Sequence, residues 1–235
     1  MANFDFEDIA IIEQTGYKPT AALIFLHGEG QTGQEICNIF KDYFGTKSGH
    51  SYFKLIFPTA PVRTLTSRNP KLHDQRYWFD VVPTGQSSVD VSCNLKDAED
   101  VSSALDRLIE KTSISGVPRD RIVIGGISQG GMVSLYAAYA RGIRIGGVVS
   151  IASPFLFHKQ TTLLDGKKPP LLSIYGEKDV SISSEEMNTT WTMFKQKQLP
   201  ATIKKLRQQG HNMHTDYAKV IFEWLQSEFP PLEWF

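Results

Sequence analysis

The chain of 235 residues is poor in cysteine and has no long apolar run. Its two cysteines, Cys37 and Cys93, are too few for the disulfide framework of a small secreted domain. No apolar run approaches the ~20 residues that span a bilayer, and no cysteine motif at the end indicates a lipid anchor. The acidic first residues lack the basic and apolar regions of a secretory signal. We therefore expect a cytoplasmic protein with reduced thiols and no stable membrane anchor.

The chain also has no excess of charge of either sign. It contains 25 Lys and Arg and 25 Asp and Glu, with a formal net charge of +0 at pH 7. Without a basic run, we expect no nucleic-acid partner. The length fits one large α/β domain or two small ones, and no repeat, low-complexity tract or change in composition divides the chain. We expect a single domain over residues 1–235.

Short apolar runs alternate with segments of helical period. Runs that are apolar on both faces are typical of parallel strands covered by helices. We expect strands at residues 9–12, 21–26, 53–57, 121–124, 145–151, 171–175 and 201–206. Apolar spacing predicts helices over residues 95–109, 132–140, 183–194 and 217–225. This order predicts an α/β fold with a mostly parallel central sheet and helices on both faces.

Residues 58–93 give no clear pattern of helix or strand. This stretch is rich in Pro, Asn, Thr and Gly, and we expect a long functional loop there. The aromatic residues on the helical stripes elsewhere are expected in the core and not at a cofactor.

The most informative stretch is Gly-Gly-Ile-Ser-Gln-Gly-Gly at residues 125–131, which contains the pattern Gly-x-Ser-x-Gly. An apolar β-branched run precedes it and a helix-forming run follows, which is the setting of a nucleophile elbow. Side chains two residues before or after the serine would collide with the backbone of so tight a turn, hence the glycines. We expect Ser128 to be a catalytic nucleophile. The alternative is a glycine-rich turn that binds a phosphate or nothing.

A serine nucleophile needs a base, and the base needs an acid to orient it. In this fold the acid and then the histidine follow the serine along the chain. Asp179, directly after the strand at 171–175, is the expected acid, and Glu177 is its competitor. His211 follows the last strand and is the expected base, with His214 as the alternative. Chain order argues against the other histidines.

The negative charge of the transition state also needs donors. An oxyanion hole in this fold takes one backbone N–H from the residue after the nucleophile, here Gln129. The second comes from a loop after an early strand, and residues 26–30 are such a loop. Glu29 is expected to donate through its main chain, and the glycines around it allow the backbone to approach the substrate. An ordinary glycine-rich turn is the alternative.

These motifs together resemble those of a known family. Residues 25–33 (Phe-Leu-His-Gly-x-Gly-x-Thr-Gly) are similar to the oxyanion-loop signature of acyl-protein thioesterases and related carboxylesterases. Residues 57–63 resemble the second signature of that family and residues 78–80 the third. The elbow at 125–131 is close to the family's own. Residues 124–126 (Ile-Gly-Gly) and 150–156 look especially like the lysophospholipase-like branch.

The resemblance covers nearly the whole chain and implies an α/β-hydrolase without a large lid. It implies a triad of Ser128, Asp179 and His211 that hydrolyses acyl thioesters or carboxylic esters through an acyl-enzyme. An acylated protein or a small ester would be the substrate. No cofactor and no metal are expected. Two other functions stay open on the same scaffold, namely a peptidase and a non-catalytic binding protein.

Three positions depart from the family pattern. Glu29 stands where the family usually has an apolar residue, which places a carboxylate at the pocket mouth and disfavours long acyl chains or anionic substrates. Gln31 replaces a common Asp, and Tyr175 stands where the family often has His. None of these removes a catalytic group. The candidate substrate-binding residues are Leu65, Trp78, Phe155 and Leu156.

Overall fold

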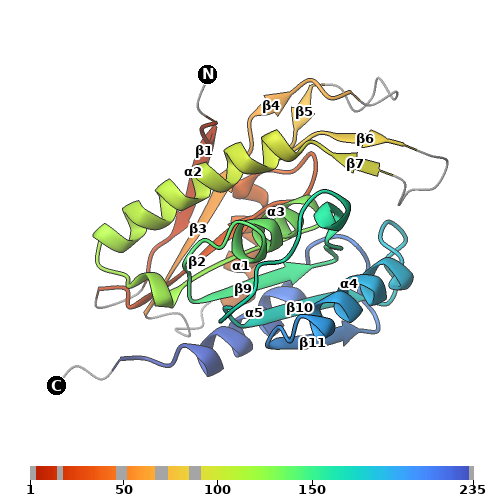
Figure 1. Cartoon of the computed structure of the whole chain (residues 1–235). Helices are drawn as coiled ribbons and strands as arrows, with labels where there is room; N and C mark the ends of the chain where they lie inside the picture. The colour runs from red at the N-terminus through yellow and green to blue at the C-terminus, as the bar shows by residue number, and fades with distance from the viewer. Residues whose placement is uncertain (1–3, 15–17, 46–51, 67–73, 85–90, 233–235) are drawn as a thin grey trace.

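A twisted, mostly parallel sheet forms the centre of the computed structural model, which describes residues 4–14, 18–45, 52–66, 74–84 and 91–232. Within these residues, seven strands pair in the order β1-β3-β2-β8-β9-β10-β11 (Figure 1). Neighbours are parallel except β1 and β3, which are antiparallel. The strands are β1 (Asp8–Ile12), β2 (Ala21–Leu26), β3 (Phe53–Thr59), β8 (Ile122–Ile127), β9 (Gly147–Ile151), β10 (Leu171–Gly176) and β11 (Ala201–Leu206). The expected parallel sheet is confirmed.

The central strands are buried on both faces. Every residue of β2, β8, β9 and β10 is buried, which agrees with their nearly continuous apolar sequences. By contrast, β11 lies at the edge of the sheet, and its residues are mostly exposed. The strand that carries the serine therefore lies in the middle of the sheet, where packing fixes its position.

Helices cover both faces of the sheet (Figure 1). One core lies beneath α2, α3 and α4, and a second lies beneath α1 and α5. No helix of the described residues is both long and apolar enough to cross a membrane. The bounds are α1 (Gly33–Phe44), α2 (Leu95–Ile114), α3 (Gln129–Tyr139), α4 (Ser184–Gln196) and α5 (Thr215–Glu228). The expectation of helices on both faces is confirmed.

The apolar pattern alone did not predict α1. This helix begins at a capping box in which the Thr32 side chain accepts from Glu35 and the Glu35 carboxylate accepts from Thr32. Its buried face carries Ile36 and Phe40, and the Phe40 ring contacts the ring of Phe57 on β3. The capping box was therefore the sequence signal for this helix.

The expectation of a long loop at residues 58–93 is wrong for part of that stretch. Its described residues contain two short antiparallel pairs, β4 with β5 and β6 with β7. β-branched valines in three of these strands favour extended structure. The bounds are β4 (Val62–Arg63), β5 (Gln75–Arg76), β6 (Val81–Pro83) and β7 (Val91–Cys93). Residues 67–73 and 85–90 of the same stretch lie outside the described residues.

Candidate active site

Ser128 occupies the turn between β8 and α3 in a conformation that few side chains adopt. Its φ is 52° and its ψ is −123°, so it lies in the region of positive φ. The Ser128 N–H donates to the Ile151 carbonyl of β9 at 2.8 Å. The Ser153 hydroxyl donates to the Ser128 carbonyl at 3.0 Å. Bonds on both sides of the residue thus stabilise a strained backbone at the end of a buried strand.

Backbone atoms fill the space on either side of the serine. A Cβ added at Gly126 would lie 2.4 Å from the carbonyl carbon of Gly130. A Cβ added at Gly130 would lie 2.5 Å from the carbonyl oxygens of Leu26 and His27. Contacts under 3.0 Å require the backbone to move, so both positions need glycine. The expected collision at this turn is confirmed.

Asp179 and His211 lie together at the carboxyl edge of the sheet. Asp179 follows β10 and His211 follows β11, and these two strands are parallel neighbours. The His211 Nδ1 lies 2.8 Å from the Asp179 Oδ2. The other carboxylate oxygen accepts from the main-chain N–H groups of Ser181 and Ile182 at 2.8 and 2.9 Å. The carboxylate is fully shielded from solvent and can hold a proton on Nδ1, which leaves Nε2 for proton exchange.

The two competing residues have other surroundings. Glu177 is exposed. His214 is the N-cap of α5, and its Nδ1 accepts from the main-chain N–H of Asp216 at 3.3 Å. The structure therefore brings Asp179 and His211 together, and gives the alternative histidine a capping role.

Ser128 and His211 line the same cavity of about 480 Å³, together with Glu29 and Gln129. No hydrogen bond joins the Ser128 hydroxyl to the His211 ring among the described residues. Bonds of this kind are often long until a substrate binds. The apolar lining comprises Phe79, Val81, Val91, Ile127, Met132, Leu156 and Ile182. The other polar lining residues are Gln31, Gln75, Ser181, Glu186 and Asn212. The lining of the cavity thus contains both apolar and polar side chains.

A short segment at residues 76–79, here called the bridging segment, contacts the loop after β2. The Gly30 N–H donates to the Arg76 carbonyl at 2.9 Å. The Trp78 indole Nε1–H donates to the His27 carbonyl at 2.8 Å, and Trp78 is fully buried. These two bonds flank residue 29 and fix the path of the loop beside Ser128.

The bridging segment also contacts the nucleophile elbow through one side chain. The Gln129 Oε1 accepts from the Trp78 main-chain N–H at 2.7 Å. The Gln129 Nε2 donates to the Phe79 carbonyl at 2.9 Å. Because Gln129 is buried, these bonds lie in a region of low dielectric, where an unpaired amide would be costly. The segments that carry the N–H groups of residues 29 and 129 are therefore joined through the bridging segment.

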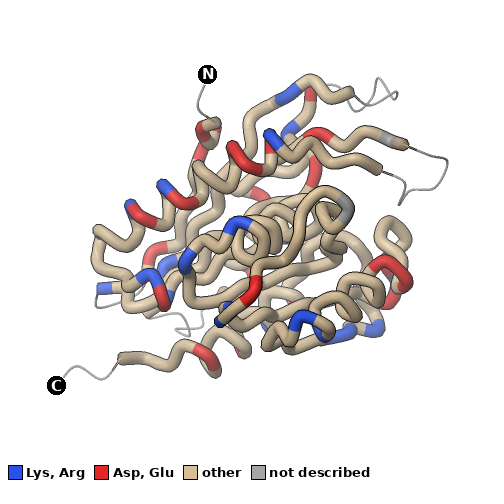
Figure 2. Tube along the Cα trace, viewed as in Figure 1, with Lys and Arg blue, Asp and Glu red and all other residues tan. Residues whose placement is uncertain are grey.

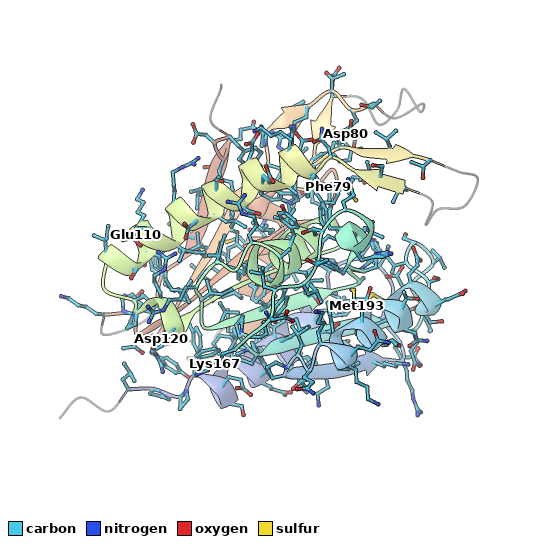
Figure 3. The ribbon with its side chains drawn as sticks, viewed as in Figure 1. Phe79, Asp80, Glu110, Asp120, Lys167 and Met193 are labelled. Atoms are coloured by element: carbon cyan, nitrogen blue, oxygen red, sulfur yellow. The ribbon has the colours of Figure 1, made fainter. Side chains whose placement is uncertain are left out.

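An ion pair supports the far side of the bridging segment. The Arg63 guanidinium donates to the Trp78 carbonyl at 2.9 Å and to the Asp97 carboxylate at 2.5 Å. The second oxygen of Asp97, in the first turn of α2, accepts from the Asp80 N–H at 2.9 Å. Phe79 and Asp80 accordingly lie near the start of α2 (Figure 3). The signatures at residues 57–63 and 78–80 thus meet in one network.

The three departures from the family pattern all have identifiable contacts. The Glu29 carboxylate accepts from the Tyr77 hydroxyl at 3.1 Å. Burial raises the pKa of Glu29, while the bond from Tyr77 and the charge of His211 oppose that rise. The Gln31 Oε1 accepts from the N–H of Gly28 at 2.9 Å and so supports the loop after β2. The Tyr175 ring packs edge-on against Trp191 of α4.

Of the candidate substrate-binding residues, Leu156 lines the cavity. Leu65, Trp78 and Phe155 are buried and are not among its lining residues. Trp78 donates to the His27 carbonyl in the loop after β2, and Phe155 packs against the ring of Phe157. Sequence reasoning missed the remaining apolar lining. Met132 could have been found, since it lies one helical turn after Ser128.

His27 is a buried histidine whose ring supports the loop after β2. Its Nε2 accepts from the Ala60 N–H at 3.0 Å, so this nitrogen carries no proton. Its Nδ1 lies 2.6 Å from the Gly28 carbonyl and therefore donates to it. Burial lowers the pKa of His27 to about 4, because the charged ring would lose its hydration. The ring is thus neutral at neutral pH and joins the loop to the end of β3.

A serine at a strained turn after a central strand, with an Asp–His pair at the same sheet edge, defines the α/β-hydrolase class. The sequence pattern of the phospholipase/carboxylesterase family matches residues 7–228, and the chain belongs to that family. The expectation of an esterase-type hydrolase is therefore confirmed at the level of the family.

Individual relatives agree with this assignment. Lysophospholipase-like protein 1 of Mus musculus is 26% identical over 225 residues, covering 94% of this chain and 91% of the relative. Acyl-protein thioesterase 1 of Gibberella zeae is 27% identical over 226 residues, covering 90% of this chain and 92% of the relative. Among solved structures, Arabidopsis thaliana SOBER1 superposes with a TM-score of 0.74 at 21% identity, covering 90% and 99% of the two chains. Zea mays acyl-protein thioesterase 2 superposes with a TM-score of 0.73 at 18% identity, covering 94% of this chain and 98% of the other.

We predict that the free energy of unfolding falls as the pH is lowered from about 6.5 to about 4. In that window His27 stays neutral in the fold but takes up a proton in the unfolded chain. The neutral His27 ring contributes fully to the free energy of unfolding above the pKa of histidine in the unfolded chain. That contribution is lost as the pH falls to the lower pKa of His27 in the folded protein. The full loss is about 3 kcal/mol, and denaturant unfolding between pH 4 and 8 measures it.

The control for this prediction is His27→Gln, whose amide can still bond to Ala60 and Gly28 but does not titrate. Other groups titrate alike in both proteins, so the difference between the two curves isolates His27. The variant should lose stability less steeply on acidification. Identical slopes in the two proteins would contradict the assigned neutral ring.

Proposed function

We propose that the protein hydrolyses acyl thioesters or carboxylic esters with Ser128 as nucleophile, His211 as base and Asp179 as the acid that orients it. The observation that supports this proposal most strongly is the 2.8 Å contact between the Asp179 Oδ2 and the His211 Nδ1. His211 and Ser128 also line the same cavity. The names of the relatives, an acyl-protein thioesterase and a lysophospholipase-like protein, favour acylated proteins or small esters as substrates.

The first half of the reaction forms an acyl-enzyme. The Ser128 Oγ attacks the carbonyl carbon while its proton passes to the Nε2 of His211. Asp179 holds the ring in the required tautomer and stabilises its charged form. The negative oxygen of the tetrahedral intermediate accepts from the main-chain N–H groups of Glu29 and Gln129. The bond to the leaving sulfur or oxygen then breaks, and His211 protonates the leaving group.

The second half releases the acid. A water molecule gives its proton to His211 and attacks the acyl carbon, and collapse of the second intermediate returns the proton to the Ser128 oxygen. The carboxylic acid leaves and the free serine is restored. Apolar lining residues such as Met132, Leu156 and Ile182 supply contact area for the acyl chain in both steps.

We predict that Ser128→Ala and His211→Ala each lower kcat by about three to five orders of magnitude, because the triad acts as one unit. Asp179→Asn should cost as much or less, since it disturbs the histidine tautomer and leaves the nucleophile in place. Initial rates on p-nitrophenyl esters and acyl thioesters of graded chain length measure these losses.

Matched controls come from the two competing positions. His214→Ala and Glu177→Gln should each keep kcat within about threefold of the wild type, because surface substitutions have small effects. If His214→Ala were inactive while His211→Ala turned over normally, the base would be assigned to the wrong histidine.

We further predict that the wild type prefers short or medium acyl groups. A charged carboxylate at the cavity weakens apolar contact with a long chain, in which each buried methylene contributes about 0.8 kcal/mol. Glu29→Leu should shift the ratio of kcat/KM for palmitoyl over butyryl thioesters upward. A wild type much faster on palmitoyl than on octanoyl thioesters would contradict this prediction, as would an unchanged ratio in Glu29→Leu.

A further inference from the structure

The described residues that line the cavity include more acidic than basic side chains. Apart from the His211 ring, its described lining residues carry two charges, the carboxylates of Glu29 and Glu186, and no Lys or Arg. These two residues come from distant parts of the chain, the oxyanion loop and the first turn of α4. The start of α4 is accordingly drawn red in Figure 2. The nucleophile therefore lies in a cavity with negative side chains from two elements.

A neutral partner holds the Glu29 carboxylate. The Tyr77 hydroxyl donates to it at 3.1 Å, and no ion pair among the described residues includes Glu29. Glu29 and the His211 ring also line the same cavity. Because His211 gives its proton to the leaving group, that group must lie beside the same ring. The Glu29 charge therefore lies in the same cavity as a leaving group that His211 protonates.

Neutral groups also hold Glu186. One of its carboxylate oxygens accepts from the Ser183 main-chain N–H and hydroxyl, both at 2.7 Å, in the capping box of α4. No ion pair of the described residues includes it, although the dipole of α4 offsets part of its charge. Bonds to neutral donors fix a carboxylate without cancelling its charge, so both groups can attract a cation that enters the cavity.

We propose that this site selects esters and thioesters whose leaving group carries a positive charge near the scissile bond, and that Glu29 and Glu186 determine the preference. This inference rests on the proposed hydrolase function. The leaving thiol or alcohol would bear an ammonium or guanidinium group, and the two carboxylates would replace part of its lost hydration. A negatively charged leaving group would meet like charges in a confined space and be disfavoured.

Three octanoyl thioesters that differ only in the charge of the leaving thiol test the proposal. The thiols are thiocholine, its neutral isostere 3,3-dimethylbutanethiol, and the anionic 2-mercaptoethanesulfonate. Each kcat/KM is divided by the rate constant of alkaline hydrolysis, because charge also changes the intrinsic reactivity of the thioester. We expect the cation to exceed the isostere by about tenfold, and the isostere to exceed the anion by a similar factor. Both ratios should shrink with added salt.

Charge-removing variants assign the effect to particular residues. Glu29→Gln keeps an acceptor for Tyr77, and Glu186→Gln keeps one for Ser183, since capping boxes also use glutamine. Each should lower the cation-to-neutral ratio about threefold, and the double variant should bring it close to one. Glu185→Gln is the matched control. It removes the same charge from the residue next to Glu186, and Glu185 does not line the cavity. It should keep the wild-type ratio.

A second set of substrates distinguishes a small cationic thiol from a basic peptide. Octanoyl-cysteine peptides flanked by Lys or by the uncharged norleucine are compared in the same way. A Lys preference indicates a basic peptide, and a preference limited to thiocholine indicates a small amine.

Two results would overturn the inference while the hydrolase proposal stands: hydrolysis with equal normalised rates for the three thiols, or a cation preference that persists in the double variant. Failure of the wild type to hydrolyse any thioester or ester would overturn the hydrolase proposal itself, and this inference with it.

Discussion

The proposed mechanism depends on one constraint: two main-chain donors on separate segments must point at one oxygen atom. The N–H groups of residues 29 and 129 belong to segments about a hundred residues apart in the chain. The bridging segment joins them, through Gly30 on one side and the buried Gln129 side chain on the other. Such donors contribute to catalysis only when they are held in place before the reaction begins. The hydrogen bonds of Trp78 to His27 and to Gln129 join the two segments and would supply that rigidity in the proposed mechanism.

The sheet and its loops hold Ser128, Asp179 and His211 in position. Ser128 can keep a positive φ because β8 is buried between β2 and β9, and because glycines allow the loops to approach closely. The buried Asp179 carboxylate has hydrogen-bond partners for both oxygens, namely two main-chain N–H groups and His211. Each functional group follows a parallel strand, and the carboxyl ends of these strands meet at one edge of the sheet. Ser128, Asp179 and His211 therefore lie on loops that the sheet topology brings to the same edge.

Much of this could be predicted from local sequence. The elbow has a short-range signature, and the order of Asp179 and His211 after it follows from the order of strands along the chain. The strand at residues 201–206 was predicted with its observed bounds. The helix at α1 was missed although Thr32 and Glu35 form a capping box, because the apolar pattern alone was read there.

Other features depend on contacts that no local pattern reveals. The short strands within residues 58–93 pair across intervals of 8 to 14 residues along the chain, and Trp78 gains its partners 51 residues away. Val81 and Val91, which line the cavity, belong to the paired strands β6 and β7. The contact between Glu29 and Tyr77 spans 48 residues. Non-local pairing of this kind is fixed by tertiary structure and not by propensity.

The most direct test of the account is covalent labelling of the folded protein with a fluorophosphonate, followed by mass mapping of the modified residue. An activated serine beside a formed oxyanion hole should be labelled at Ser128, at a rate that falls strongly in His211→Ala, and Ser128→Ala should not be labelled. A non-catalytic binding protein on the same scaffold would stay unmodified. Absence of labelling in the folded wild type, or labelling at a residue other than Ser128, would contradict the account.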